Sequence, residues 1–395
     1  MTKRNTEGEV LMRPSQTSGR AGQLVPVWDL GVRAFHWVLV CSVLGSAVTG
    51  FIIGRTALGW HLIAGEAMIV ALGWRGVWGL LGSRFARFAS FAYRPHTVIH
   101  HLRELRDRKA VRHLGHNPLG AMMVFAFLGV LLGIALTGVI GLGGMLKQGP
   151  ARAFLSYATG VQALQWHNLL AFLVLAMICL HLAGVAYESW RGRENLVAAM
   201  ITGDKAGLVD AAPVARVRAH PLGALAIVLV VGTLGVSAVV QLSGRPAPLV
   251  PPAVTDPVFA EQCGACHVAF PGSLASAFSW ADILQDLQHH FGADASLGPD
   301  QVATIRNWLA TNSAEHWDTL PSHVLRTPAA DGSLRITDTP GWRARHSAIT
   351  LSTFAAKPIY RSSNCVACHA DTASGMFAPQ NIAIPPIEAP NSRAP

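Results

Sequence analysis

Five stretches of the chain are almost entirely apolar, and polar and charged residues lie mainly between and after them. Each stretch has about the 20 residues that an α-helix needs to cross roughly 30 Å of hydrocarbon. After the last one, prolines gather and the composition changes, which indicates a stiff linker followed by a soluble part. The pattern predicts five transmembrane helices, over residues 34–53, 60–81, 118–142, 163–187 and 221–242.

Composition and charge agree with a membrane protein that carries a soluble extension. Of the 395 residues, 51% are hydrophobic and 13% are charged. Residues 1–242 hold 22 of the 31 Lys and Arg residues but 10 of the 22 Asp and Glu residues, a balance of +12, which leaves −3 for residues 243–395. The basic residues lie in short loops between apolar stretches, where they act as topology signals, so we expect no nucleic-acid partner.

The loop at 82–117 carries the strongest topology signal, with eight Lys and Arg residues against two acids. Such basic loops stay on the cytoplasmic side of a membrane. The N-terminus then lies inside as well, and five crossings place everything after Leu242 outside. We therefore expect a multi-pass protein of the bacterial inner membrane, with a cytoplasmic N-terminal tail at 1–23 and a periplasmic C-terminal part.

Two Cys-X-X-Cys-His motifs follow the last apolar stretch, at Cys263–His267 and Cys365–His369. The two thiols of such a motif add across the vinyl groups of haem, and the adjacent histidine becomes an axial ligand of the iron. A zinc site would combine four Cys and His ligands around one ion, which fits worse because each motif already carries its own histidine. The sequence predicts two haems c, attached through Cys263, Cys266, Cys365 and Cys368 and ligated by His267 and His369.

Four histidines lie inside the apolar stretches, where a polar ring is costly and therefore a candidate for function. His167 and His181 share one predicted helix, 14 residues apart, so they lie on one face and about 21 Å apart along the axis. His36 begins the first helix on the cytoplasmic side, and His61 begins the second on the periplasmic side. Depth therefore pairs His36 with His181 and His61 with His167, each pair across one haem b.

Two arginines accompany these histidines, Arg75 within the second predicted helix and Arg33 beside the first. Arginine recognises carboxylates, so both are candidates to hold haem propionates. The alternative is that they snorkel to the membrane interface. Five histidines of the basic loop are expected to contact headgroups or solvent rather than iron: His96, His100, His101, His113 and His116.

The soluble part offers few distal ligands for the haems c. Its single methionine beyond the linker is Met376, close behind His369, which favours histidine at both sixth positions. Ser279–Asp282 is typical of a helix start, and on the helix that would follow His290 borders the apolar face while His289 points the opposite way. His290 is therefore the expected ligand of the first haem c. For the second, the residues leave three candidates open: His316, His323 and His346.

Several blocks between residues 24 and 205 resemble the prokaryotic cytochrome b561 family, which includes the b-type cytochrome subunits of nickel–iron hydrogenases. The blocks are Val27–Asp29, His36–Trp37, Gly82–Phe88, Leu114–Gly120, Arg193–Leu196 and Met200–Gly203. The resemblance implies an integral membrane four-helix bundle that holds two haems b between the four histidines named above and exchanges electrons with quinone. The fifth predicted helix, within 206–242, and the soluble tail lie outside the family pattern.

The tail resembles the small soluble dihaem cytochromes c that are often encoded beside such b cytochromes. The likeness rests on Glu261–His267, Trp280, His290–Gly292, Ile336–Pro340, His346 and Asn364–Cys365. It implies His346 as the distal ligand of the second haem c. The expected fold class is all-α: a b561-like domain at 24–205, a connector and fifth helix at 206–242, a Pro-rich linker at 243–257, a mostly α dihaem domain at 258–378 and a disordered tail at 379–395.

The expected function is electron transfer between the membrane quinone pool and a soluble periplasmic cytochrome or other redox protein, through two haems b and two haems c. A second hypothesis is an enzyme, for example one that oxidises superoxide at the periplasmic haem b with quinone as acceptor. It needs an open positive funnel, for which the loops offer Arg55, Lys147 and Arg152. A third is a haem-based ligand sensor, which needs a five-coordinate haem c.

Overall fold

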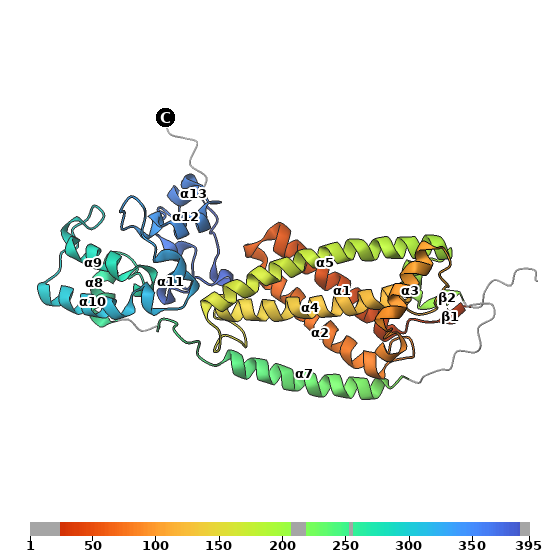
Figure 1. Ribbon diagram of the computed structural model, residues 1–395. Coiled ribbons are helices and arrows are strands. Elements are labelled where there is room, and N and C mark those ends of the chain that lie inside the picture. The colour runs from red at the N-terminus through yellow and green to blue at the C-terminus, as the bar shows by residue number, and fades with distance from the viewer. Residues whose placement is uncertain (1–23, 207–218, 253–255, 388–395) are drawn as a thin grey trace, which may run out of the picture. The chain divides into compact units, whose positions relative to one another are not determined.

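Long α-helices make up the first part of the chain and short helices the second (Figure 1). The computed structural model describes residues 24–206, 219–252 and 256–387. These residues form two compact units. The first lies within 24–36, 75–125 and 178–224, and the second within 37–74, 126–177 and 225–387.

Five long helices occupy the apolar stretches. They are α1 (Leu30–Ala47), α2 (Leu58–Leu81), α4 (Pro118–Met145), α5 (Tyr157–Gly192) and α7 (Pro221–Ser243). A π-helical turn, Val48–Ile53, continues α1. Pro118 and Pro221 begin their helices at the first position, where the missing N–H is harmless. The side chain of Asn117 caps α4 by accepting a hydrogen bond from the Gly120 amide at 2.7 Å.

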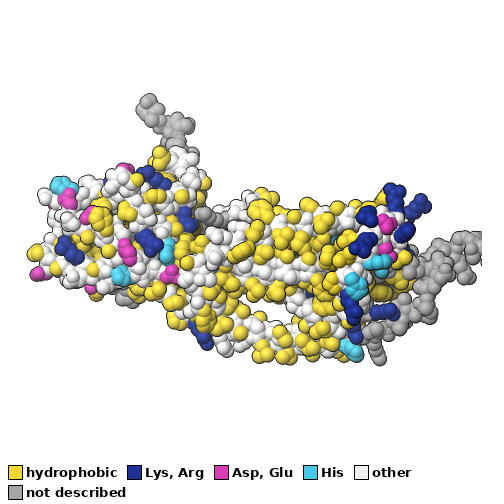
Figure 2. Space-filling view, in the orientation of Figure 1, with side chains coloured by type: hydrophobic (Ala, Val, Ile, Leu, Met, Phe, Trp, Pro, Cys, Tyr) yellow, Lys and Arg dark blue, Asp and Glu magenta, His cyan; other side chains and the backbone are white. Residues whose placement is uncertain are grey.

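Four helical stretches of the described chain are long and apolar enough to cross a membrane: Leu30–Ile53, Pro118–Met145, Tyr157–Gly192 and Pro221–Ser243. Figure 2 shows their apolar side chains on the surface of the long helices. The expected second span, α2, is not among the four, although it has 24 residues. Its His61, Glu66 and Arg75 lower its mean hydropathy, so two candidate haem-site residues, His61 and Arg75, also weaken its membrane signal.

The first unit is closed by a two-stranded antiparallel sheet, in which β1 (Leu24–Pro26) pairs with β2 (Asp204–Ala206). Its helices besides the long ones are α3 (Pro95–Arg106) and α6 (Leu196–Thr202). Gly203 ends α6 with a φ of 96°, and its carbonyl accepts hydrogen bonds from the Val27 and Trp28 amides. A Cβ at this glycine would lie 2.6 Å from the Trp28 carbonyl oxygen, so only glycine allows the approach.

The soluble part of the second unit is built from short helices around a small apolar core. The helices are α8 (Pro257–Gly264), α9 (Ala277–Gln285), α10 (Pro299–Asn312), α11 (Leu320–Leu325), α12 (Pro340–His346) and α13 (Leu351–Ala355). Phe259, Trp280 and Ile305 are buried in the core that α8, α9 and α10 share. Trp280 also donates from its Nε1 to the Gly272 carbonyl at 2.8 Å, which satisfies its buried polar atom.

Two local expectations differ from the structure. Helix α9 begins at Ala277, capped by Ser276, and ends at Gln285, so His289 and His290 lie beyond it, in and after a 3₁₀ turn at Leu287–His289. Residues 379–387, expected in a disordered tail, include a 3₁₀ turn at Pro379–Asn381. Residues 379–387 are held by hydrogen bonds at Asn381 and Ala383 to the end of the second Cys-X-X-Cys-His motif and the residue after it, which their Pro-rich composition does not reveal.

Candidate haem-binding sites

His61 and His167 face one another in the second unit. His61 lies near the start of α2 and His167 lies in α5, and their ring centroids are 6.1 Å apart. An iron held between two Nε2 atoms, at about 2 Å from each as in other imidazole–metal bonds, needs ring centroids roughly 6 Å apart. The two rings therefore have the spacing of two axial ligands of one haem.

Both rings of this pair are anchored in the same way, through Nδ1. For the histidine of α2, the partners of Nδ1 are the Ser46 carbonyl and the Thr49 hydroxyl, each at 3.2 Å. For the histidine of α5, they are the Ile134 carbonyl at 3.0 Å and the Thr137 hydroxyl at 3.3 Å. A proton on Nδ1 satisfies these acceptors and leaves the lone pair of Nε2 for a metal. This anchoring fixes both the tautomer and the direction of each ring.

The sequence carries a sign of this arrangement that residue-by-residue reasoning missed. A Thr-Gly dipeptide occurs in each of the two anchoring segments, at Thr49–Gly50 and Thr137–Gly138. A Cβ on the first glycine would lie 3.4 Å from Cε1 of His61, and one on the second would lie 3.3 Å from Cε1 of His167. The threonine thus holds the imidazole, while the glycine beside it leaves room for the ring.

His36 and His181 form the other predicted pair, in the first unit. They belong to α1 and α5, and they lie close enough for their charges to interact. The structure thus sets His61 against His167, as expected from depth, and places His36 and His181 within range of an electrostatic interaction, with the two pairs in different units.

Arg75 lies in a box of aromatic rings in the first unit and is only 2% exposed. Its Cζ is 4.3 Å from the ring centroid of Phe88, 5.8 Å from that of Phe91 and 5.9 Å from that of Phe35. Its Nη1 has no hydrogen-bond partner among the described residues. A buried guanidinium of this kind is a site for an anionic group.

His116 lies beside this arginine and corrects the expectation that it faces headgroups or solvent. Its ring packs 4.4 Å from Phe91 and 4.8 Å from Trp28, centroid to centroid. Burial, with smaller effects of the Arg75 and Lys205 charges, lowers the pKa of His116 to about 4, so the ring is neutral at pH 7. Its buried Nδ1 also has no partner within the described part of the chain. Sequence could not show this, because the burial comes from residues distant in the chain.

Arg33, the other arginine expected near haem, has a partner in the protein. Its Nη1 donates a hydrogen bond to the Ile201 carbonyl at the end of α6. Its Nε is buried without a partner among the described residues. Arg33 therefore holds α6 against α1 with one part of its guanidinium and leaves the other part for a further acceptor.

The first Cys-X-X-Cys-His motif meets His290. The ring centroids of His267 and His290 are 6.2 Å apart with nearly parallel planes, 17° from one another. Nδ1 of His267 lies 2.7 Å from the Val268 carbonyl, which again directs Nε2 away from the backbone. Burial, with the charges of His267 and Arg335, lowers the pKa of His290, and burial raises the pKa of Cys263 to about 11.

The second motif meets His346 in the same manner. The centroids of His346 and His369 are 6.2 Å apart, with planes at 70°. Nδ1 of His346 lies 2.9 Å from the Trp342 carbonyl one turn earlier in α12. Burial lowers the pKa of both rings, so both imidazoles are neutral at pH 7 and able to bind a metal. Burial also raises the pKa of Cys365 to about 11.

Comparisons with known proteins match the two parts of the chain separately. Residues 27–203 match the family model of prokaryotic cytochrome b561, and residues 259–377 match that of dihaem cytochrome c. The chain joins a prokaryotic cytochrome b561 domain to a dihaem cytochrome c domain. It is a membrane protein that transfers electrons through haems b and c.

Relatives of each domain have sequences of modest identity. The b561 domain is similar to probable Ni/Fe-hydrogenase B-type cytochrome subunits from Cupriavidus necator, 26% identical over 47% of this chain and 88% of that protein, and from Bradyrhizobium diazoefficiens, 23% identical over 46% and 85%. The dihaem domain is similar to the diheme cytochrome c of Rhodobacter sphaeroides, a solved structure with 34% identity that covers 31% of this chain and 96% of that one, with a TM-score of 0.27.

The other histidines of the dihaem domain have partners away from the motifs. His289 is exposed and pairs with Asp286 at 2.8 Å. Nε2 of His316 lies 2.9 Å from the Ala310 carbonyl. His323 contacts Asp318 at 2.9 Å. Among the three alternatives left open by sequence for the second haem c, the structure brings His346 to the motif.

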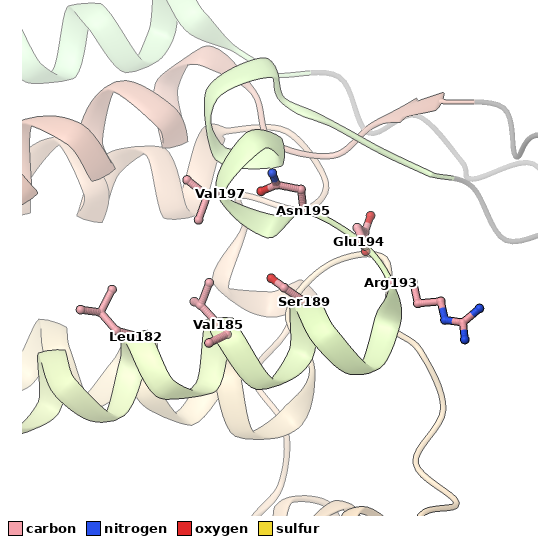
Figure 3. Close-up of a pocket in the computed structure, with 8 residues that line it drawn as sticks. Leu182, Val185, Ser189, Arg193, Glu194, Asn195 and Val197 are labelled. Atoms are coloured by element: carbon pink, nitrogen blue, oxygen red, sulfur yellow. The ribbon is translucent and has the colours of Figure 1, made fainter.

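A pocket of about 560 Å³ lies in the b561 domain, between the last turns of α5 and the start of α6. Figure 3 shows Leu182, Val185 and Ser189 of α5 pointing toward Val197 of α6, while Arg193 points away from them. Val185 follows His181 by four residues, so both lie on one face of α5. Leu182, which also lines the pocket, directly follows His181, so the pocket lies next to a candidate haem ligand.

The glycine beside His167 gives a first prediction. Gly138→Val should push His167 out of position, because the first carbon of the new side chain already meets the ring. We expect loss of one of the two haems b, seen as a halved haem b content in a pyridine haemochrome assay. Gly129→Val is the matched control, since a Cβ at Gly129 has no neighbour within 4 Å. Equal haem b contents in the two variants would contradict the assignment.

A second prediction concerns the sixth position of the first haem c. His290→Ala should open this position and create carbon monoxide binding in the reduced protein, measured by the shift of the Soret band. His289→Ala should leave the spectrum unchanged, because the exposed His289 is paired with Asp286 rather than with the motif. Carbon monoxide binding in the His289 variant alone would reverse the assignment.

Proposed function

We propose that the chain carries electrons between the membrane quinone pool and a soluble periplasmic redox protein, through two haems b and two haems c. His36 with His181 and His61 with His167 would ligate the haems b. His267 with His290 and His369 with His346 would ligate the haems c, held covalently by Cys263, Cys266, Cys365 and Cys368. The observation that carries the proposal is the ring spacing, which is 6.1 Å between His61 and His167 and 6.2 Å in both pairs of the dihaem domain.

Bound haem would supply a one-electron couple at each site, and the chain's residues set the conditions for it. Carbonyl and hydroxyl acceptors at Nδ1 hold the imidazoles in one orientation. Burial lowers the pKa of His290 and of His346, so both rings are neutral at pH 7. A neutral imidazole can bind iron without first losing a proton. Two fixed imidazole ligands keep the geometry of the site constant when the iron gains or loses an electron, and they leave no open position on the iron for a substrate. Such a site is suited to electron transfer rather than to substrate binding.

Arg75 and His116 would hold a propionate of the haem between His36 and His181. Arg75 follows His61 in α2 by 14 residues, as His181 follows His167 in α5. An identical spacing along two helices puts Arg75 about 21 Å along the axis from His61, at the depth of the other pair. The unpartnered Nη1 of Arg75 and Nδ1 of His116 supply two donors for one carboxylate.

The pocket beside α6 is our candidate for the quinone headgroup. Apolar Leu182, Val185 and Val197 would contact an apolar ring, while Ser189 and Asn195 supply polar groups at its edge. Leu182 is 60% exposed, and on a membrane helix such exposure faces lipid, so a lipid-soluble molecule could enter from the side. By the expected topology this entrance lies on the cytoplasmic side, near His181.

Two alternatives are less well supported. Oxidation of superoxide needs an open positive funnel near His61, but Lys147 is buried against Asp318 and Arg152 donates to the Arg245 carbonyl. The side chain of the third candidate, Arg55, lies outside the described residues. A ligand sensor needs an open iron position, whereas both attachment motifs have a second imidazole at ligand spacing.

The order of reduction tests the proposed function. In the full-length protein in lipid nanodiscs, a short-chain quinol should reduce haem b before haem c in stopped-flow spectra. His61→Ala should slow haem c reduction by more than about tenfold, because it removes a ligand on the route, while dithionite should still reduce both haems c. His96→Ala, in the exposed part of the basic loop, is the control. Reduction of haem c at the wild-type rate without His61 would show that the b561 domain does not feed the dihaem domain.

The buried arginine gives a separate prediction. Arg75→Gln should lower the midpoint potential of one haem b by on the order of 60 mV, equivalent to about 1.4 kcal/mol for one electron, because a nearby positive charge stabilises the reduced site. Potentiometric titration measures this shift. Arg84→Gln, an exposed arginine of the following loop, should leave both haem b potentials in place. An unchanged potential in the Arg75 variant would remove it from the haem environment.

A further inference from the structure

Asp318 of the dihaem domain makes contacts with the loop between α4 and α5 of the b561 domain. Its Oδ2 accepts hydrogen bonds from Lys147 Nζ at 2.8 Å and from the Tyr157 amide at 2.7 Å. All three residues belong to the second compact unit, although Asp318 is 161 residues from Tyr157 in the chain. One carboxylate thus links two segments that the sequence places in different domains.

Lys147 is a buried cation that depends on this carboxylate. Its side chain is 1% exposed, and its Nζ also donates to the Leu155 carbonyl at 2.9 Å. Burying an ammonium without a counter-charge is costly, so the partner has to stay in place. Burial by itself would raise the pKa of Asp318, but hydrogen bonds from Lys147, His323 and the Tyr157 amide lower it below its usual range, so the carboxylate is ionised at pH 7.

The same carboxylate caps a membrane helix. Tyr157 is the first residue of α5, and its amide is one of the N–H groups that the helix cannot satisfy internally. A negative charge at a helix N-terminus is also favoured by the helix dipole. Asp318 therefore performs for α5 the task of a capping residue from a distant part of the chain.

His323 completes the contact with a stacked ring. Its Nε2 lies 2.9 Å from Oδ1 of Asp318, and its plane is 10° from that of Tyr157, with centroids 4.2 Å apart. The carboxylate and the imidazole together therefore engage both the backbone and the ring of Tyr157. Such a set of directional contacts specifies one orientation of the dihaem domain rather than a general attraction.

A second contact shows which side of the dihaem domain is turned toward the b561 domain. The turn Pro379–Asn381 packs against Arg55–Ala57, the turn just before α2. This tail segment is hydrogen-bonded to the second attachment motif: the Ala370 amide donates to the Asn381 carbonyl at 2.9 Å, and the Ala383 amide donates to the Cys368 carbonyl at 2.8 Å.

We propose that Asp318 docks the dihaem domain on the periplasmic loops of the b561 domain in one orientation, with the second attachment motif, Cys365–His369, next to the loop that leads to His61. Electrons from the b561 domain then enter the dihaem domain at its second motif, and the first motif is the one left for a soluble partner. The two attachment motifs thus follow the b561 domain along this route in the reverse of their order in the sequence. The inference rests on the proposed function for this direction, but the docking itself does not.

Hydrogen exchange on the full-length protein tests the docking contact. Asp318→Asn should speed exchange of the Tyr157 amide by more than about tenfold, because the charged acceptor of that amide is lost. Asp286→Asn is the matched control, since Asp286 also pairs with a histidine, His289, but in an exposed position. Exchange that is unchanged in the Asp318 variant, or equally faster in both, would overturn the contact.

Cross-linking tests the orientation without relying on these variants. With Cys41→Ser and Cys179→Ser as background, Thr56→Cys and Gln380→Cys should be joined by a short bismaleimide, identified as a linked peptide by mass spectrometry. The control pair, Thr56→Cys with Ser296→Cys, places the second thiol in the loop after His290 and should not react. Linkage of both pairs would mean a mobile domain, and linkage of the control pair alone would mean the opposite orientation. Neither readout depends on quinol, so a failed docking and a failed electron route are told apart.

Discussion

The structure depends on one recurring constraint: two imidazole rings from different segments of the chain must face one another at a fixed separation. In three pairs the centroids are 6.1 or 6.2 Å apart, the space that one ligated metal requires. A neutral ring has no charge to hold it in place, so a hydrogen bond from Nδ1 to a carbonyl does so. His61, His167, His267 and His346 each have such a carbonyl. The two domains meet this requirement in different ways. In the long helices, a carbonyl and a threonine hydroxyl about one turn apart hold each imidazole. In the dihaem domain, one histidine of each pair belongs to a Cys-X-X-Cys-His motif, whose two cysteines are the expected points of covalent haem attachment.

In the b561 domain the imidazole rings have to be held inside helices that face lipid, where polar groups are costly. His61 and His167 show how a polar ring inside the long helices can be satisfied, because each Nδ1 lies within hydrogen-bond distance of a carbonyl and a threonine hydroxyl. Thr49 satisfies two groups at once. Its hydroxyl donates to the Gly45 carbonyl at 2.7 Å, and the oxygen keeps a lone pair that can accept a hydrogen bond from His61 Nδ1. Helix α2 carries both His61 and Arg75, so the long helix that is not among the four candidate membrane spans supplies contacts at two depths.

Features encoded over a few residues could be read from the sequence, and those that depend on distant packing could not. The attachment motifs need only their own spacing, and the helix ends at Pro118 and Pro221 need only proline chemistry. The pairing of His36 with His181 and His61 with His167 followed from depth, because a straight helix converts residue number into distance. The helical-wheel argument for His290 relied on a helix that ends at Gln285, yet His290 meets His267 through the turn that follows. The burial of His116 and the order of residues 379–387 come from contacts across the fold, to which local composition is blind.

Helix α5 connects the docking contact with the haem sites. Tyr157, which Asp318 caps, precedes His167 by ten residues, or about 15 Å of continuous helix. A helix is stiff over this length, so a carboxylate that fixes its first amide also fixes where His167 lies with respect to the dihaem domain. The linker alone could not do this, because its stiffness limits reach but not rotation. In the proposed docking, the capping group of the helix that carries His167 belongs to the partner domain. This would fix the separation of the two redox domains, which a conduit for electrons needs and a tethered carrier does not.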